Sequence, residues 1–207
     1  MARPREFDER QVLEAAGDAF WARGFEATSM RDLVRLTGLT QPSLYNAFGD
    51  KRGLYRRALD HYLTRTLHER MRRVESVLPP GAAITAFMSE VIERSLSDQQ
   101  HRGCMLVNAA VESTPDDEDL QAAIVAELDQ MRAFFRRCMA AGQGSGEIPP
   151  ALPPEAAATH LLAVLLGLRV LARIEPRRAL LEGAVSPTLG LLGLPPLPAA
   201  DGGQRPQ

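Results

Sequence analysis

Polar side chains gather in a short segment, residues 41–48, that we expect to be a helix. Gln41, Ser43 and Asn46 are small or polar, as the N-terminal part of a helix needs to be when it enters the major groove of DNA. Tyr45 offers a hydroxyl and Lys51 a charge for phosphate oxygens, contacts that fix register without reading sequence. The chemistry that these residues suit is recognition of double-stranded DNA.

Two short helices would have to position these side chains. Ser29 can cap a helix that carries Asp32 three residues later, as in a capping box, and Thr40 can cap the next helix, where Pro42 is tolerated in the first turn. Between them stands Thr-Gly-Leu-Thr, with Gly38 free to adopt a left-handed conformation. This spacing predicts a helix-turn-helix over about residues 28–48. A helical hairpin inside an ordinary bundle fits the same spacing.

The charge of the chain is unevenly divided. Residues 1–73 hold 14 Lys and Arg against 10 Asp and Glu, a net charge of +4, whereas residues 74–207 hold 10 against 16, a net charge of −6. A basic front on an acidic body hints at a polyanionic partner for the front. Residues 41–48 contain no charge, so we expect the flanking cations to grip phosphate: Arg3, Arg5, Arg31, Arg35, Lys51, Arg52, Arg56 and Arg57.

The whole chain is predicted to be helical, because no stretch alternates with period two and β-branched residues are sparse. A first helix starts after Asp8 and stops at Gly24, and a long helix follows Asp50 to about residue 74. The later segments are expected at 82–96, 103–112, 114–141, 155–174 and 177–192, the last interrupted by Pro187. The fold class is therefore all-α, with a DNA-binding domain at 6–66, a helical body at 67–192 and a disordered tail at 193–207.

Several classes of protein are disfavoured. The longest aliphatic run, residues 161–168, is too short to cross a membrane, and the N-terminus has no apolar signal core. Two cysteines make no disulfide framework, so we expect a reducing, cytoplasmic compartment. Neither a catalytic motif nor close metal-ligand or cofactor spacing is evident, so we predict no enzyme, metal or cofactor. A helical adaptor that uses the front to bind protein is the alternative of another class.

Residues 28–55 resemble the signature of TetR-type transcriptional regulators, and residues 19–28 resemble the end of that family's first helix and its turn. The resemblance covers about residues 6–55. It implies a homodimer whose chains each have a three-helix DNA-binding head and a helical body with a ligand pocket. It further implies that a small molecule releases a near-palindromic operator, with repression as the usual mode.

The resemblance also carries roles onto individual residues. Thr28, Tyr45 and Lys51 resemble phosphate contacts, Thr40 caps the recognition helix, and Gln41 and Ser43 occupy the base-facing turn. Many relatives have glycine at the place of Pro42, so their base preference does not transfer. The full set expected to bind DNA is Thr28, Ser29, Thr40, Gln41, Pro42, Ser43, Tyr45, Asn46 and Lys51.

In the body we expect a pocket for a largely apolar inducer, although each of the lining candidates also fits an ordinary core position, which is the commoner role of such residues. The candidates are Phe87, Val91, Cys104, Val107, Asn108, Phe134 and His160. Cys104 stands at an expected helix N-terminus beside Arg102, which would stabilise a thiolate, so covalent or redox modification of Cys104 is an alternative switch. The helices in 155–192 are the expected dimer interface, which Pro187 could bend or shorten.

Overall fold

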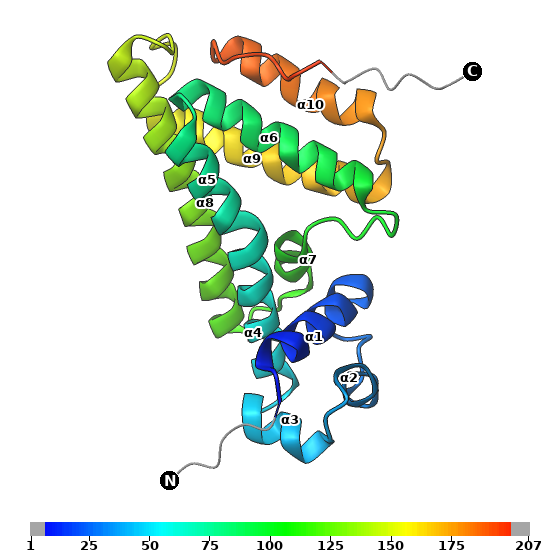
Figure 1. The fold of residues 1–207 in the computed structure, drawn as a ribbon. Helices are drawn as coiled ribbons and strands as arrows, with labels where there is room; N and C mark the ends of the chain where they lie inside the picture. Colours follow the sequence, from blue (N-terminus) through cyan, green and yellow to red (C-terminus); the bar gives the residue numbers. More distant parts are fainter. Residues whose placement is uncertain (1–6, 200–207) are drawn as a thin grey trace, which may run out of the picture. The chain divides into compact units, whose positions relative to one another are not determined.

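The computed structural model describes residues 7–199, and every regular element in that range is a helix. This confirms the all-α fold class. The elements are α1 (Glu9–Arg23), α2 (Met30–Thr37), α3 (Gln41–Phe48), α4 (Lys51–Leu63), the π-helix η1 (Thr64–His68), α5 (Glu69–Val77), α6 (Pro80–Ser97), α7 (Met105–Glu112), α8 (Glu118–Ser145), α9 (Pro154–Ile174) and α10 (Arg178–Leu191) (Figure 1).

The chain forms two compact units. The first joins residues 1–72 with 98–130, and the second joins 73–97 with 131–207. Each unit is therefore built from two separate stretches of the chain, whereas the sequence suggested a contiguous division near residue 66. The reason is that residues 98–130, which carry α7, contact the N-terminal helices.

The core of the first unit forms where α1 and α4 pack together and α2 and α3 close over them. Phe20 of α1 is buried and meets the ring of Tyr55 edge-on, with 4.9 Å between centroids. Leu33 from α2 and Leu44 from α3 are equally buried. Apolar residues at helical spacing thus fix α2 and α3, two helices of eight residues that are too short to be stable alone.

The π-helix η1 interrupts the long α-helix that the sequence predicts after Asp50. α4, η1 and α5 follow one another without a break from Lys51 to Val77, and η1 occupies residues 64–68. Within it the Thr66 hydroxyl donates to the Tyr62 carbonyl at 2.7 Å. Such turns occur mostly as single insertions in α-helices and shift the register of the residues beyond them.

The second unit is centred on α6, α9 and α10, which contact one another and lie side by side in Figure 1. Phe87 of α6 packs against Phe134 and Phe135 of α8, with ring centroids 5.3 and 5.7 Å away. Arg169 of α9 is also buried and donates to the Ser95 hydroxyl at 2.7 Å. Large apolar side chains therefore fill this unit, around one hydrogen-bonded guanidinium.

α9 is long and apolar enough to cross a membrane by length and composition, and it is the one such helix in residues 7–199. The aliphatic run of residues 161–168 did not indicate this, because small apolar residues on either side extend the stretch. In the structure less than half of its most apolar window is buried within the chain.

Two helix ends differ from the sequence expectation. α8 begins at Glu118, because residues 115–116 form a turn and Asp117, 6% exposed, pairs with Arg52 at 3.0 Å. At its other end α8 continues through Gly142 to Ser145. A Cβ on Gly142 would lie 2.4 Å from the Ile148 side chain, so this glycine makes room for the returning chain.

The prediction that Pro187 interrupts the last helix is wrong, since α10 is continuous from Arg178 to Leu191. Pro187 cannot donate to the Gly183 carbonyl, but both residues lie on the exposed side of α10, where water can satisfy that carbonyl. The buried residues Leu181, Val185 and Leu189 hold the opposite side in place.

The prediction of a disordered tail from residue 193 is also wrong for the part that the structure describes, 193–199. Leu194 is 6% exposed, and the Pro195 carbonyl accepts a hydrogen bond from Thr85 of α6 at 2.8 Å. An apolar side chain and one backbone acceptor anchor this segment to α6. The remainder of the predicted tail, 200–207, lies outside the described residues.

Candidate nucleic-acid interface

The turn between α2 and α3 has the geometry that the sequence predicts. Gly38 adopts a left-handed conformation, φ 72°, and its N–H donates to the Val34 carbonyl at 3.1 Å. Thr40 is extended and caps α3, because its hydroxyl accepts from the Ser43 N–H at 3.3 Å. The cap and the glycine together set where α3 begins and in which direction it leaves the turn.

The start of α2 is a complete capping box. The Ser29 hydroxyl accepts from the Asp32 N–H at 3.1 Å, and the Asp32 carboxylate accepts from the Ser29 N–H at 3.2 Å. The hydrogen bond from the Ser29 hydroxyl is the main cause that lowers the pKa of Asp32 to about 2, and Arg35 and Arg23 add to it. Asp32 therefore remains charged at neutral pH and opposes negative charge nearby. The two reciprocal hydrogen bonds between Ser29 and Asp32 fix the residue at which α2 begins.

α3 presents an uncharged polar face. Gln41, Pro42, Tyr45 and Asn46 are exposed, and Ser43 is half-buried. The Gln41 amide nitrogen lies 3.4 Å from the Tyr45 hydroxyl, one turn along the same face. Leu44 and Phe48 are buried on the opposite face. A face of this kind can offer donors and acceptors to base edges.

Lys51 follows this face at the start of α4. Its ammonium lies 4.3 Å from the centre of the Phe25 ring and 3.4 Å from the Glu26 carbonyl oxygen. Among residues 7–199 no carboxylate forms an ion pair with Lys51. The positive charge of Lys51 is therefore held in place but is not neutralised.

Thr28 is buried, so its side chain does not offer the phosphate contact that the resemblance implied. Its side chain is 0% exposed, and its hydroxyl donates to the Gly24 carbonyl at 2.7 Å. The threonine therefore ties the end of α1 to the start of α2 and presents no hydroxyl to DNA. Ser29, one residue later, is exposed at the surface.

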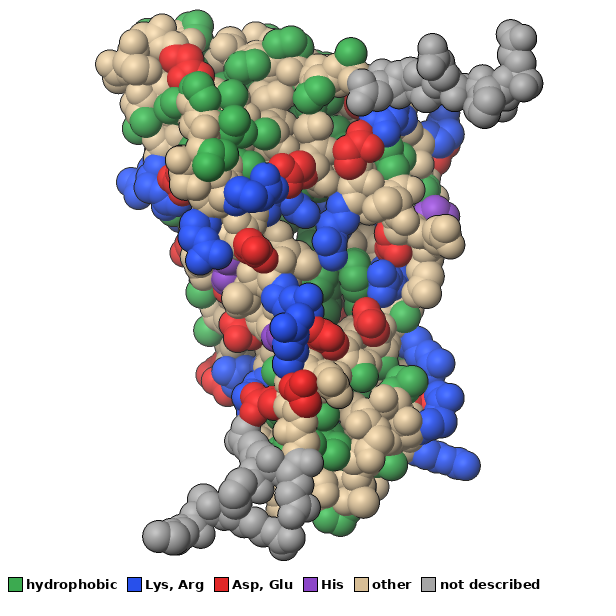
Figure 2. All heavy atoms as spheres, viewed as in Figure 1, with side chains coloured by type: hydrophobic (Ala, Val, Ile, Leu, Met, Phe, Trp, Pro, Cys, Tyr) green, Lys and Arg blue, Asp and Glu red, His purple; other side chains and the backbone are tan. Residues whose placement is uncertain are grey.

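Four of the six flanking cations that the structure describes are already paired, whereas Arg31 and Lys51 form no ion pair with a described residue. Arg52 contacts Asp117 at 3.0 Å, Arg56 contacts Asp119 at 2.8 Å, and Arg57 contacts Glu9. Arg35 contacts Asp32 at 3.3 Å. Figure 2 shows Lys and Arg side chains lying beside Asp and Glu side chains on the face in view. Arg3 and Arg5 lie outside the described residues.

The two ends of α7 contact α1 and the turn after it, an arrangement that the sequence did not indicate. Arg102, just before α7, places its guanidinium 3.8 Å from the centre of the Trp21 ring and 3.1 Å from the Asp18 carboxylate. At the other end, the Glu112 carboxylate accepts from the Phe25 N–H at 2.7 Å. The pKa of the neighbouring Tyr55 is raised, first by burial and then by Glu112 and Asp117.

The candidate inducer contacts fall into both units. In the second unit Phe87, Val91 and Phe134 are buried in the core, and His160 is exposed with its ring 3.3 Å from the Thr188 hydroxyl. In the first unit the remaining candidates, Cys104, Val107 and Asn108, are half-buried. The Asn108 amide donates to the Arg102 carbonyl at 3.0 Å. That these seven residues share one ligand stays a prediction.

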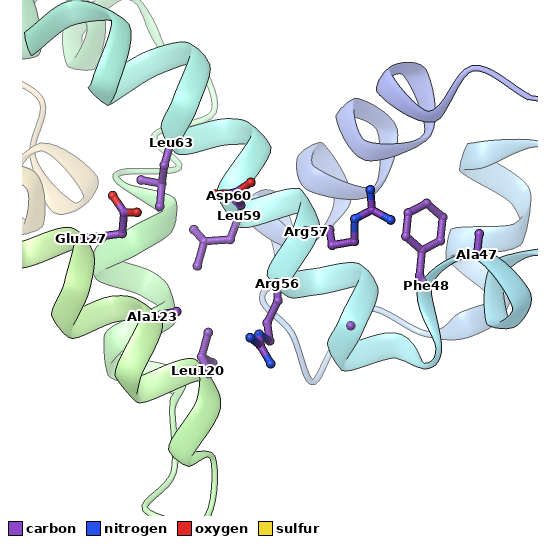
Figure 3. A pocket seen from close by; sticks show the side chains of 11 residues that line it. Ala47, Phe48, Arg56, Arg57, Leu59, Asp60, Leu63, Leu120, Ala123 and Glu127 are labelled. Atoms are coloured by element: carbon purple, nitrogen blue, oxygen red, sulfur yellow. The ribbon is translucent and has the colours of Figure 1, made fainter. Parts of the chain in front are cut away.

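The first unit contains a cavity that the sequence did not predict (Figure 3). Its volume is about 430 Å³, and none of the candidate inducer contacts lines it. The lining residues come from the end of α3, from α4 and from α8: Ala47, Phe48, Gly53, Arg56, Arg57, Leu59, Asp60, Leu63, Leu120, Ala123 and Glu127. No sequence signal marks it, because the residues from α8 are far along the chain from those of α3 and α4 and meet them only in the folded unit.

Known proteins resemble the chain over both units. Residues 12–58 match the family described as bacterial regulatory proteins, tetR family, and residues 80–186 match the family described as tetracyclin repressor-like, C-terminal domain. The HTH-type transcriptional repressor ComR of Escherichia coli (strain K12) is 30% identical over 83% of this chain and 82% of its own length. The HTH-type transcriptional repressor DhaR of Mycobacterium sp. (strain GP1) is 24% identical over 84% of this chain and 86% of its own.

A solved structure agrees with these matches. The TetR family regulator CifR, as a cysteine mutant in complex with a 26-bp operator DNA, shares 35% identity with this chain. It covers 91% of this chain and 98% of its own, with a TM-score of 0.81.

Replacing Lys51 by alanine should weaken binding to specific and nonspecific DNA alike, because an unpaired charge near phosphate does not read sequence. The slope of log K against log salt should become shallower by about one unit. Fluorescence anisotropy over a salt series measures both. Arg56→Ala removes the same charge from an existing ion pair and should change the slope less. Equal slopes for wild type and Lys51→Ala would contradict the assignment.

The two cysteines should differ in reactivity. Cys138 is 4% exposed, and burial is the main cause that raises the pKa of its thiol to about 12, so it is almost entirely protonated at neutral pH. Cys104 is half-buried at the N-cap of α7. A maleimide at pH 7.5 should therefore label Cys104 well before Cys138, as measured by peptide mass spectrometry over time. Equal labelling rates would be the contrary result.

Proposed function

This chain belongs to the TetR family of transcriptional regulators, and on that premise we propose that it is a cytoplasmic repressor that binds a near-palindromic operator as a homodimer. The observation that carries the proposal is the uncharged polar face of α3 beside the unpaired charge of Lys51. A small molecule bound by the body would release the operator, as is typical of the family.

The proposed division of labour on DNA follows from exposure and charge. The side chains of Gln41, Ser43 and Asn46 read base edges, and the Pro42 ring contacts a thymine methyl group. Tyr45 and Lys51 contact phosphate. Ser29 and Thr40 add exposed hydroxyl groups at the N-termini of α2 and α3, and an anion is favoured at the N-terminus of α3, whose first turn holds no acid. Two such surfaces related by a twofold axis read half-sites about 34–36 Å apart or at a multiple of that spacing.

The proposed dimer forms through α9 and α10. Exposed residues recur every three or four positions along α9, and the last of them, Val170 and Ile174, are 44% and 76% exposed. α10 carries a parallel stripe of small residues that ends in Leu191, 77% exposed. Two helices with such stripes on each chain suit a four-helix interface. The stripe residues are Ala156, His160, Ala163, Gly167, Val170, Ile174, Ala179, Gly183, Ser186, Gly190 and Leu191.

A switch through Cys104 is the alternative to reversible inducer binding. The partial exposure of Cys104 and its place at the α7 N-cap support this alternative. The guanidinium of Arg102, which was expected to stabilise the thiolate, instead contacts Asp98, Asp18 and Trp21. Release of the operator on alkylation of Cys104 would favour this alternative. Normal induction of Cys104→Ser would exclude it.

The function is tested by selecting bound sequences from random DNA with the full-length chain. Wild type should enrich a near-palindrome. Gln41→Ala should lose about 1–3 kcal/mol of discrimination at one base position of each half-site, because it removes base contacts and leaves the phosphate contacts intact. No enrichment by the wild type would refute the proposed function, and an unchanged logo for Gln41→Ala would refute only the role of this residue.

The dimer is tested at Gly167. A Cβ at this position would contact nothing within 4 Å of the chain, so an arginine fits the monomer but would block a facing helix. Gly167→Arg should shift sedimentation from dimer toward monomer and weaken operator binding. Gly144 is also helical and equally open, and Gly144→Arg is the matched control that should remain dimeric. A purely dimeric Gly167→Arg would rule out this face.

A further inference from the structure

We infer that the cavity between α4 and α8 is a small-molecule site, separate from the expected inducer pocket, and that it takes an amphipathic carboxylate. At about 430 Å³ it is within the range of ligand pockets, ~300–1,000 Å³. All of its lining residues belong to the first unit. Figure 3 shows α4 and α8 facing one another across it.

The floor of the cavity is apolar. Leu59 and Leu63 of α4 face Leu120 and Ala123 of α8 (Figure 3), and each of the three leucines is at most 5% exposed. Three small residues, Ala47, Gly53 and Ala123, also line it. An apolar chain in this slot would bury the half-exposed side chains of Ala47 and Ala123.

An ion pair at one end and a hydrogen bond at the other connect the helices that bound the slot. Arg56 of α4 contacts Asp119 of α8 at 2.8 Å, and His68 of η1 contacts Glu127 of α8 at 2.6 Å. Asp119 and Glu127 are eight residues apart, which is about 12 Å along a helix. The slot therefore suits an extended chain with a polar group at one end.

The charged groups favour an anionic head at the arginine end. Arg56 lines the cavity, and its guanidinium has N–H donors beyond those used by Asp119. Arg57 also lines it, but its guanidinium lies 5.1 Å from the centre of the Phe48 ring and pairs with Glu9, so Arg56 is the group assigned to the anionic head. Asp119 is 81% exposed, so its pairing with Arg56 has little net strength and a ligand carboxylate can replace it.

The two acids of the lining differ in their effect. Glu127 accepts from Gln130 at 3.2 Å with one oxygen and contacts His68 with the other. Its charge is therefore engaged within the protein. Asp60, exposed on α4, is the lining residue whose negative charge would repel an anionic ligand. Removing this charge therefore tests whether the head group of the ligand is negative.

The probes are decanoate, decylammonium and decanol, titrated into the full-length protein by calorimetry below the concentrations at which they form micelles. Decanoate should bind with 1:1 stoichiometry, and decylammonium at least tenfold more weakly. Octanoate should bind more weakly than decanoate by about fourfold for each missing buried methylene. The proposal is overturned if decanoate shows no saturable binding, or if decylammonium or decanol binds as tightly.

Matched variants locate the site. Ala123→Phe fills the slot and should abolish decanoate binding, whereas Ala122→Phe, on the exposed side of α8, should retain it. Arg56→Gln should weaken binding at least tenfold, and Asp60→Asn should tighten it severalfold. Binding that survives Ala123→Phe overturns the site.

If circular dichroism shows Ala123→Phe to be unfolded, the opposite effects of the two exposed charge variants decide, and the absence of either effect overturns the proposal. No DNA is involved, so this outcome is independent of the repressor function.

Discussion

Carboxylates between residues 112 and 119 tie the segment before α8 and its first turn to the helices of the first unit. Glu112 accepts from the Phe25 amide, Asp117 pairs with Arg52, and Asp119 pairs with Arg56. These contacts bring the segment from the end of α7 to the first turn of α8 against α4 and the turn after α1, and Asp117 is buried where it does so. Because a buried carboxylate must keep its partner, the position of this segment and that of α4 are mutually constrained.

This constraint divides the positive charge of the front into two kinds. Arginines on α4 are engaged within the protein, and Lys51 keeps an unpaired charge near the polar face of α3. The net charge of a segment therefore overstates what is available to a polyanion. Phosphate contacts that depend on a few unpaired cations make affinity sensitive to individual residues, and base contacts by neutral side chains supply specificity.

The second unit combines a tightly packed aromatic core with two helices that each keep an exposed apolar face. Its aromatic cluster around Phe87 and Phe134 packs α6 against α8. In contrast, α9 and α10 each keep one exposed face of small and apolar residues. Glycines with open space on that face allow another backbone to approach closely. The continuity of α10 through Pro187 extends the same face to the end of the helix.

The elements that could be predicted from the sequence are those that depend on local bonds. The capping box at Ser29, the left-handed Gly38 and the Thr40 cap fix α2, the turn and α3, because their partners lie within four residues. Only the tertiary structure decided that Thr28 is buried, that Arg52 and Arg56 are paired, that residues 193–199 pack on α6, and that a cavity separates α4 from α8. Apart from Thr28, whose hydroxyl donates to Gly24, each of these depends on partners tens of residues away. The approach of those partners is set by the packing of whole helices and leaves no local pattern.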